Sequence, residues 1–209
     1  MPKKSKKNLT IYIILSVVAA IVIIKALTGH MPFNLGFQTP ARGKGSRAAK
    51  VQITEFIDFQ CPACANGSKF LKEYLVKHPS DIYLEVKYFP LPSIHRHAQR
   101  SARYAECSAQ QNKFWPMLDL LMEEQPRWAG LMNAEDTFKK MASVVQLDKG
   151  QLDACLRDQG TERIIIKEKE LGQSMGVQST PTYFINGKLF VGVKSLKDEL
   201  NTYFGDVTD

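Results

Sequence analysis

The chain has 209 residues, enough for one domain of ordinary size with additional segments. Its net charge of +7 is confined to the N-terminus, because residues 1–50 carry nine of the 28 Lys and Arg residues and no acid. Residues 51–209 carry the other 19 against all 21 Asp and Glu residues, a net charge of −2. This balance gives little support to nucleic-acid binding, and we expect no nucleic-acid partner.

The N-terminal residues have the pattern of a membrane signal. Residues 1–8 ("MPKKSKKN") form a basic segment, and the run from Asn8 to Ile24 carries no charge. As a helix this run is about 26 Å long, just enough to cross the core of a bilayer. We predict a transmembrane signal anchor over residues 9–27, with a cleaved signal peptide as the alternative. The preceding lysines favour an N-terminus inside the cell and a domain on the extracytoplasmic side, periplasmic or outer.

A linker and a folded domain follow the apolar run. Residues 28–50 contain four Gly, two Pro and no acid, which is typical of a flexible tether. We therefore expect the folded domain to occupy residues 51–209.

The domain opens with a strand–helix–strand pattern. Residues 50–59 ("KVQITEFIDF") are mostly apolar and rich in β-formers, as in a buried strand. Apolar positions recur at helical spacing over residues 62–77, and Pro62 suits a first helical turn. Residues 81–89 alternate with a period of two, as in a second strand. This order is the beginning of an α/β fold.

The remainder combines a long helical stretch with a terminal hairpin. Residues 94–175 have the periodicity of four or five helices. Asn186-Gly187 is the strongest hairpin signal in the chain, between two short strands. Residues 195–204 form a final helix. The order predicts an α/β domain with an all-helical insertion.

The sequence "CPAC" places Cys61 and Cys64 where the first strand ends and the first helix begins. A zinc site needs four ligands. The remaining candidate ligands lack ligand spacing: Cys107, Cys155, His95 and His97. A structural disulfide across two residues closes too small a loop to stabilise a fold much. Redox chemistry fits best, because the start of a helix stabilises a thiolate at Cys61. We expect no metal and no cofactor.

Several separated motifs carry a resemblance to a known family. "CPAC" at 61–64 and "QSTPTYFING" at 178–187 resemble the active-site segments of the thioredoxin superfamily. With the helical insertion, "FPLPSIHRHA", "NKFWPMLDLL" and "GVQSTPTYFING" are similar to the DsbA-like thiol:disulfide oxidoreductases. The resemblance covers roughly residues 51–205. It implies a thioredoxin fold with an inserted all-helical subdomain, preceded in this chain by a single N-terminal transmembrane helix.

The resemblance implies roles in the active-site loop. Cys61 would be the exposed nucleophile and Cys64 the buried resolving thiol, with Pro62 and Ala63 between them. The strongly oxidising members have His where this chain has Ala63. Since that His helps to hold the thiolate, we expect a less depressed Cys61 pKa and a weaker oxidant.

Three residues outside the loop receive roles in the same way. Thr180 and Pro181 would form a cis-peptide loop that faces the disulfide and binds substrate. The alternative for Pro181 is a trans proline at a strand start. Glu55 would be the buried acid that moves protons to the resolving thiol, and its alternative is a surface position on the exposed face of the strand.

Cys107 and Cys155 lie in the helical insertion. They are either two buried thiols or a disulfide. An even number of cysteines in an oxidising compartment favours the disulfide, and some DsbA-like proteins carry a second one. We predict a structural disulfide that contributes about 4 kcal/mol.

These features indicate a membrane-anchored extracytoplasmic enzyme that introduces disulfides into exported proteins. Its substrates would be reduced exported polypeptides. By resemblance, a quinone-linked membrane partner of the DsbB or VKOR-like type would re-oxidise it. The alternatives are a disulfide isomerase or reductase of the same fold, or a peptide-binding chaperone with an incidental CxxC.

Overall fold

The computed structural model describes residues 40–205. The basic segment 1–8, the predicted transmembrane segment 9–27 and the first part of the predicted tether lie outside the described residues. No helix within residues 40–205 is long and apolar enough to cross a membrane.

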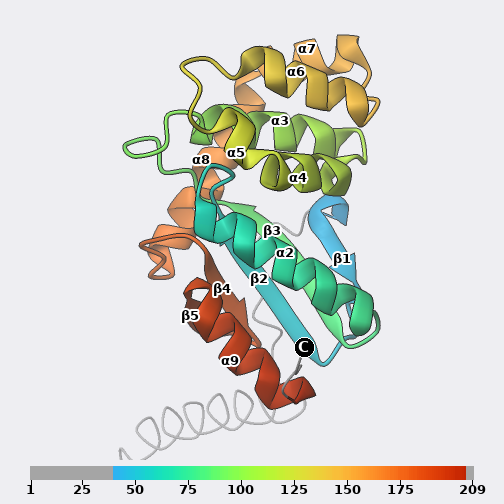
Figure 1. Cartoon of the computed structure of the whole chain (residues 1–209), viewed down its shortest axis with the longest axis vertical. Helices are drawn as coiled ribbons and strands as arrows, with labels where there is room; N and C mark the ends of the chain where they lie inside the picture. Colours follow the sequence, from blue (N-terminus) through green and yellow to red (C-terminus); the bar gives the residue numbers. More distant parts are fainter. Residues whose placement is uncertain (1–39, 206–209) are drawn as a thin grey trace, which may run out of the picture. The chain divides into compact units, whose positions relative to one another are not determined.

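The elements follow the predicted order, with a short 3-10 helix, η1, and a strand added before the first predicted strand (Figure 1). The strands are β1 (Gly43–Gly45), β2 (Val51–Ile57), β3 (Ile82–Tyr88), β4 (Thr182–Ile185) and β5 (Lys188–Val191). The helices are η1 (Pro40–Arg42), α2 (Pro62–Lys77), α3 (Ala98–Gln110), α4 (Phe114–Glu123), α5 (Gln125–Trp128), α6 (Glu135–Val144), α7 (Lys149–Arg157), α8 (Gln159–Ser174) and α9 (Gly192–Phe204). The predicted α/β architecture with an all-helical insertion is confirmed, and the insertion runs from α3 to α8.

The described strands form one mixed sheet in the order β1-β3-β2-β4-β5. β2 pairs in parallel with β3 and antiparallel with β4, so it is shielded on both edges. The predicted hairpin joins β4 to β5, with φ of 47° at Asn186 and 82° at Gly187. Positive φ at both positions is what a type I′ turn requires, which explains the Asn-Gly sequence.

Helices cover both faces of the sheet. α2 and α9 lie together on one face (Figure 1). On the other face α8 comes so close that a Cβ at Gly172 would press on the rings of Phe56 and Phe89. Because side chains alternate along a strand, Phe56 faces α8 and Glu55 faces α2. The sheet therefore places Glu55 beneath the helix that carries the cysteine pair.

Helices α3 to α7 of the insertion form a layer at the end of the sheet where α2 begins (Figure 1). Their core contains buried aromatic residues that pack on one another, with Phe138 centred 5.1 Å from Trp128 and 5.3 Å from Tyr104. These residues belong to the same continuous apolar cluster as the core between the sheet and α2, and the insertion presents α5 to the loop that carries Cys61.

The prediction of a flexible tether through residue 50 is wrong for residues 40–50. β1 pairs antiparallel with β3, and the Arg42 side chain is fully buried. Its guanidinium donates two hydrogen bonds of 2.7 Å to the carboxylate of Glu168. Gly45 suggested flexibility, but its φ of 93° and its close approach to the Ile82 carbonyl require a glycine there. The acid that holds this arm lies far along the chain, so the local composition did not reveal it.

Candidate active site

The two cysteines of "CPAC" occupy the start of α2. Cys61 is the residue before the first helical turn, and Pro62 fills the first helical position, where its missing N–H costs nothing. Cys64 is 0% exposed and Cys61 is 8% exposed. The prediction of an exposed Cys61 therefore needs correction, because the neighbouring Thr180 carbonyl, 3.4 Å from Sγ of Cys61, helps to cover it.

The two sulfurs have opposite electrostatic environments. A hydrogen bond with the Cys64 thiol, helped by the backbone N–H groups of Cys64 and Ala63 and by Thr180, lowers the pKa of Cys61 to about 5. Burial raises the pKa of Cys64 well above its ordinary value, and the neighbouring Cys61 raises it further. At neutral pH the reduced site therefore holds a Cys61 thiolate beside a neutral Cys64 thiol.

The loop before β4 lies against Cys61. The Thr180-Pro181 peptide bond is cis, as expected from the resemblance. When protonated, the Cys61 thiol donates to the Thr180 carbonyl. The Thr180 hydroxyl is buried and has no hydrogen-bond partner among residues 40–205. This hydroxyl can donate a hydrogen bond to the Cys61 thiolate, which agrees with its lowering of the Cys61 pKa.

Glu55 lies beneath α2 and is 2% exposed, so it is not a surface residue. Burial raises its pKa to about 8, opposed in part by the hydroxyl of Tyr183, which lies directly opposite on β4. The charge of Glu55 is one of the causes that raise the Cys64 pKa, so the acid is close to the buried sulfur. The Tyr183 hydroxyl packs against α2 at Gly67, where a Cβ would collide with it.

Side chains that the sequence did not single out hold the loop before Cys61. The buried Gln125 of α5 donates from Nε2 to the carbonyls of Phe59, at 2.7 Å, and Cys61, at 3.0 Å. Gln60 donates from Nε2 to the Ala129 carbonyl at 2.8 Å. Both contacts join the loop to the helical insertion. No local pattern marks Gln125, because its partners are more than sixty positions away in the chain.

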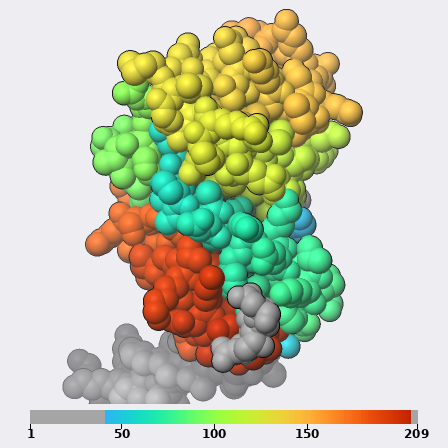
Figure 2. Space-filling model, viewed as in Figure 1, coloured from blue at the N-terminus to red at the C-terminus, as the bar shows by residue number. Residues whose placement is uncertain are grey.

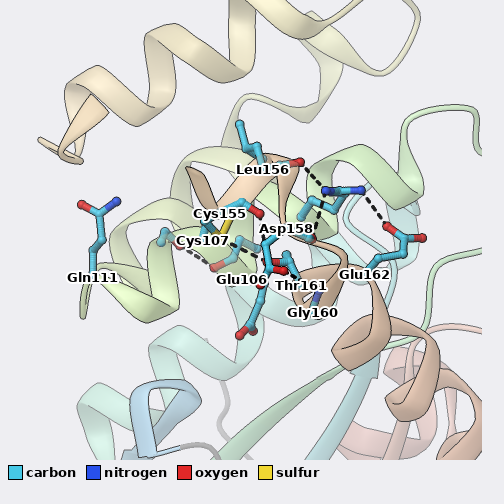
Figure 3. The surroundings of a disulfide bond; sticks show 12 residues. Glu106, Cys107, Gln111, Cys155, Leu156, Asp158, Gly160, Thr161 and Glu162 are labelled. Atoms are coloured by element: carbon cyan, nitrogen blue, oxygen red, sulfur yellow. Dashed lines mark hydrogen bonds and ion pairs between the residues drawn. A yellow bond between two sulfur atoms is a disulfide. The ribbon is translucent and has the colours of Figure 1, made fainter. Parts of the chain in front are cut away.

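Cys107 and Cys155 form a disulfide between α3 and α7, with a Cα–Cα distance of 5.7 Å (Figure 3). Next to it, Thr161 Oγ1 donates to the Cys155 carbonyl at 3.0 Å. The two residues therefore cannot complete a four-sulfur metal site with Cys61 and Cys64. Within residues 40–205 no cluster of three or more His, Cys, Asp or Glu residues could hold a metal ion.

The site lies at the start of α2, which runs between the helical insertion and α9. Figure 2 shows α2 exposed between the insertion, in yellow, and α9, in red. The structure brings together residues from four of its elements and loops: Glu55, Cys61, Pro62, Ala63, Cys64, Thr180 and Pro181. The Cys107–Cys155 disulfide belongs to the insertion and is not part of this cluster.

A family model described as thioredoxin matches residues 39–202. The chain belongs to the thioredoxin family. Solved structures show the same fold. The thiol-disulfide exchange protein α-DsbA2 of Wolbachia pipientis matches with a TM-score of 0.67 and 16% identity, over 86% of this chain and 93% of that one. Oxidised BdbD of Bacillus subtilis matches with a TM-score of 0.66 and 19% identity, over 79% and 93%. The predicted membership of the thioredoxin superfamily is confirmed, and these structures share its fold with a helical insertion.

Curated relatives match by sequence over a shorter stretch. The Na(+)/H(+) antiporter NhaA 3 of Salinispora tropica is 33% identical over 145 residues, which are 69% of this chain and 21% of that protein. The Na(+)/H(+) antiporter NhaA 1 of Salinispora arenicola is 30% identical over 145 residues, again 69% of this chain and 21% of that protein. The chain spans about a fifth of the length of these relatives, so the transport activity in their names is not carried over to it.

Proposed function

We propose that this thioredoxin-family protein oxidises pairs of thiols in exported polypeptides, with its Cys61–Cys64 disulfide as the oxidant. The observation that carries the proposal is the asymmetry of the two sulfurs. Cys61 is stabilised as a thiolate, whereas Cys64 is buried and holds its proton. The sulfur with the lower pKa is also the more exposed one, so a client reaches Cys61 first.

The reaction transfers two electrons in two exchanges. A client thiolate attacks Sγ of Cys61, a client–Cys61 disulfide forms, and Cys64 leaves as a thiolate. A second client thiolate attacks the client sulfur of that mixed disulfide, and Cys61 leaves as a thiolate. The client now has a disulfide, and the two electrons rest on the Cys61–Cys64 dithiol.

We propose that Glu55 donates a proton to Cys64 when Cys64 leaves as a thiolate. A thiolate at Cys64 is costly in its buried position, and a proton donor nearby removes the cost. With a pKa of about 8, Glu55 is protonated at neutral pH. A narrow pocket lined by Glu55, Ser68 and Lys72, among others, connects the acid toward the surface, from which it can regain its proton.

The direction of the reaction depends on the stability of the reduced form. The low Cys61 pKa stabilises the dithiol state and so favours an oxidant, although Ala63 supplies no imidazole to strengthen the effect. Equilibration of the full-length chain with glutathione redox buffers measures the potential. We expect a value between about −200 and −120 mV, above the value of about −270 mV for thioredoxin. A value at or below that of thioredoxin would assign a reductase instead.

We further propose that residues 9–27 anchor the chain with its domain on the extracytoplasmic side. A quinone-linked membrane protein of the DsbB or VKOR-like type would accept the two electrons from the dithiol. The lysines ahead of the apolar run and the Cys107–Cys155 disulfide, which suits an oxidising compartment, support this placement. In oriented membrane vesicles, protease should digest the domain only from the extracytoplasmic side. Release of the intact chain by an alkaline wash would contradict the anchor.

A further inference from the structure

Asp58 stands at the junction of β2 and the active-site loop, and its side chain is fully buried. Oδ1 accepts a hydrogen bond of 2.8 Å from the backbone N–H of Gln60. Oδ2 accepts one of 2.8 Å from the backbone N–H of Leu91 and lies 2.9 Å from Nδ1 of His95. Because a carboxylate only accepts, the His95 ring is the donor in this contact. A buried carboxylate needs such donors, and here most of them come from the loop between β3 and α3.

The main chain of Asp58 faces the two cysteines. Its carbonyl accepts a hydrogen bond of 3.0 Å from the N–H of Cys61. A backbone hydrogen bond from Asp58 also favours the thiolate of Cys64. During the proposed oxidation Cys64 leaves with a negative charge, so this donor acts where charge develops. One residue thus contacts both cysteines through its backbone while its side chain is fixed elsewhere.

We propose that Asp58 and His95 form a positioning pair, which holds the Asp58 backbone against Cys61 and Cys64 and so sets the redox equilibrium of the couple. The inference rests on the proposed function and adds to it the residues that tune the oxidant. His95 is on the β3–α3 loop and its side chain is 18% exposed. Without the His95 ring, Oδ2 of Asp58 keeps only the Leu91 N–H as a donor. The loop before Cys61 can then shift.

His97 offers a matched control two positions further along. Its Nε2 lies 2.7 Å from the carbonyl of Leu131, in the loop between α5 and α6. Removal of either ring deletes one polar contact of similar length. Only the His95 contact reaches Asp58. A general loss of stability should therefore affect both variants, whereas a change in the redox couple should follow His95 alone.

The experiment compares the full-length wild type with His95→Ala, His97→Ala and His95→Asn. Thiolate absorption of the reduced protein is measured against pH, and the equilibrium with glutathione is measured at one pH. We expect His95→Ala to raise the Cys61 midpoint by about one unit, a tenfold change in the thiol–thiolate equilibrium. The equilibrium constant for oxidation of glutathione should fall about tenfold, or about 30 mV. His97→Ala should match the wild type, and His95→Asn should restore most of the change because its amide nitrogen takes roughly the place of Nδ1.

A His95→Ala protein with the wild-type midpoint and equilibrium constant would contradict the inference, as would equal shifts in His95→Ala and His97→Ala. If His95→Ala does not fold, His95→Gln replaces it, since the longer side chain carries its amide past the Nδ1 position, and the same outcomes decide. The titration needs no client. A wild type that leaves a reduced client unoxidised therefore contradicts the proposed function and not this inference.

Discussion

Glu55 of β2 lies directly opposite Tyr183 of β4, and both side chains are buried beneath α2. Neither Oε1 of Glu55 nor the hydroxyl of Tyr183 has a partner within hydrogen-bonding geometry among the described residues. The hydroxyl is close enough to favour the carboxylate, but burial has the larger effect and raises the Glu55 pKa to about 8. The site therefore keeps an acid that is neutral at pH 7 next to the buried Cys64 thiol.

Glu55→Gln should make the free energy of unfolding less dependent on pH. The folded pKa of about 8 lies above the unfolded value of about 4.3, so the contribution of Glu55 is fully present below about pH 4 and is lost as the pH rises through 8. Gln cannot ionise. We expect the stability of the variant relative to the wild type to rise by about 3–5 kcal/mol between pH 4 and pH 9. Denaturant unfolding at several pH values measures this, and a difference that is constant with pH would contradict a buried, ionisable Glu55.

Thr180→Val should change stability and reactivity in opposite senses. The Thr180 hydroxyl is buried and has no hydrogen-bond partner among residues 40–205, so an isosteric methyl group should stabilise the fold by about 1 kcal/mol. The same hydroxyl favours the Cys61 thiolate, so its loss should raise the Cys61 pKa above about 5. Thermal unfolding and thiolate titration of the reduced protein test both parts. An unchanged Cys61 midpoint would show that the hydroxyl does not act on the sulfur.

Loss of the Cys107–Cys155 disulfide should weaken the fold without changing the active site. The disulfide joins residues 48 positions apart, a loop for which chain entropy gives about 4 kcal/mol. We expect the double variant Cys107→Ala/Cys155→Ala to lose about that much stability and to keep the wild-type Cys61 titration. Denaturant unfolding measures the first quantity. A shifted Cys61 midpoint in the folded variant would contradict the separation of the two sites.

Arg42→Met should test whether residues 40–50 belong to the domain. The change leaves Glu168 without its bidentate partner, and breaking a buried ion pair in this way costs about 3–5 kcal/mol. Lys50→Met is the control, because Lys50 pairs with Asp81 at 3.4 Å on the exposed surface, where such a pair contributes under about 1 kcal/mol. Equal effects of the two substitutions on the unfolding free energy would mean that the arm is only loosely attached.

Local patterns predicted the features that depend on neighbouring residues. The strand predicted at 81–89, the Asn186-Gly187 turn and the position of "CPAC" at a helix start each follow from short-range geometry, and the structure has all three. The cis bond before Pro181 was predicted from the resemblance, because the local sequence around a proline is compatible with both the cis and the trans isomer.

The features that escaped prediction depend on partners far along the chain. Arg42 was assigned to a tether because the buried acid that holds it lies 126 positions away. Gln125 contacts the Cys61 carbonyl across 64 positions. His95 lacks the spacing of a metal ligand, and no local pattern pairs it with Asp58 as the structure does. Composition and periodicity carry no information on such contacts, which form only when the insertion packs on the sheet.

The central claim is that the Cys61–Cys64 disulfide accepts two electrons from a client dithiol. The most direct measurement is a single turnover, in which the oxidised full-length chain is mixed with an equimolar reduced peptide that contains two cysteines. We expect one peptide disulfide for each Cys61–Cys64 disulfide lost, with Cys107–Cys155 intact and no oxidation by Cys61→Ser. A peptide that stays reduced, or that is oxidised equally by Cys61→Ser, would contradict the account.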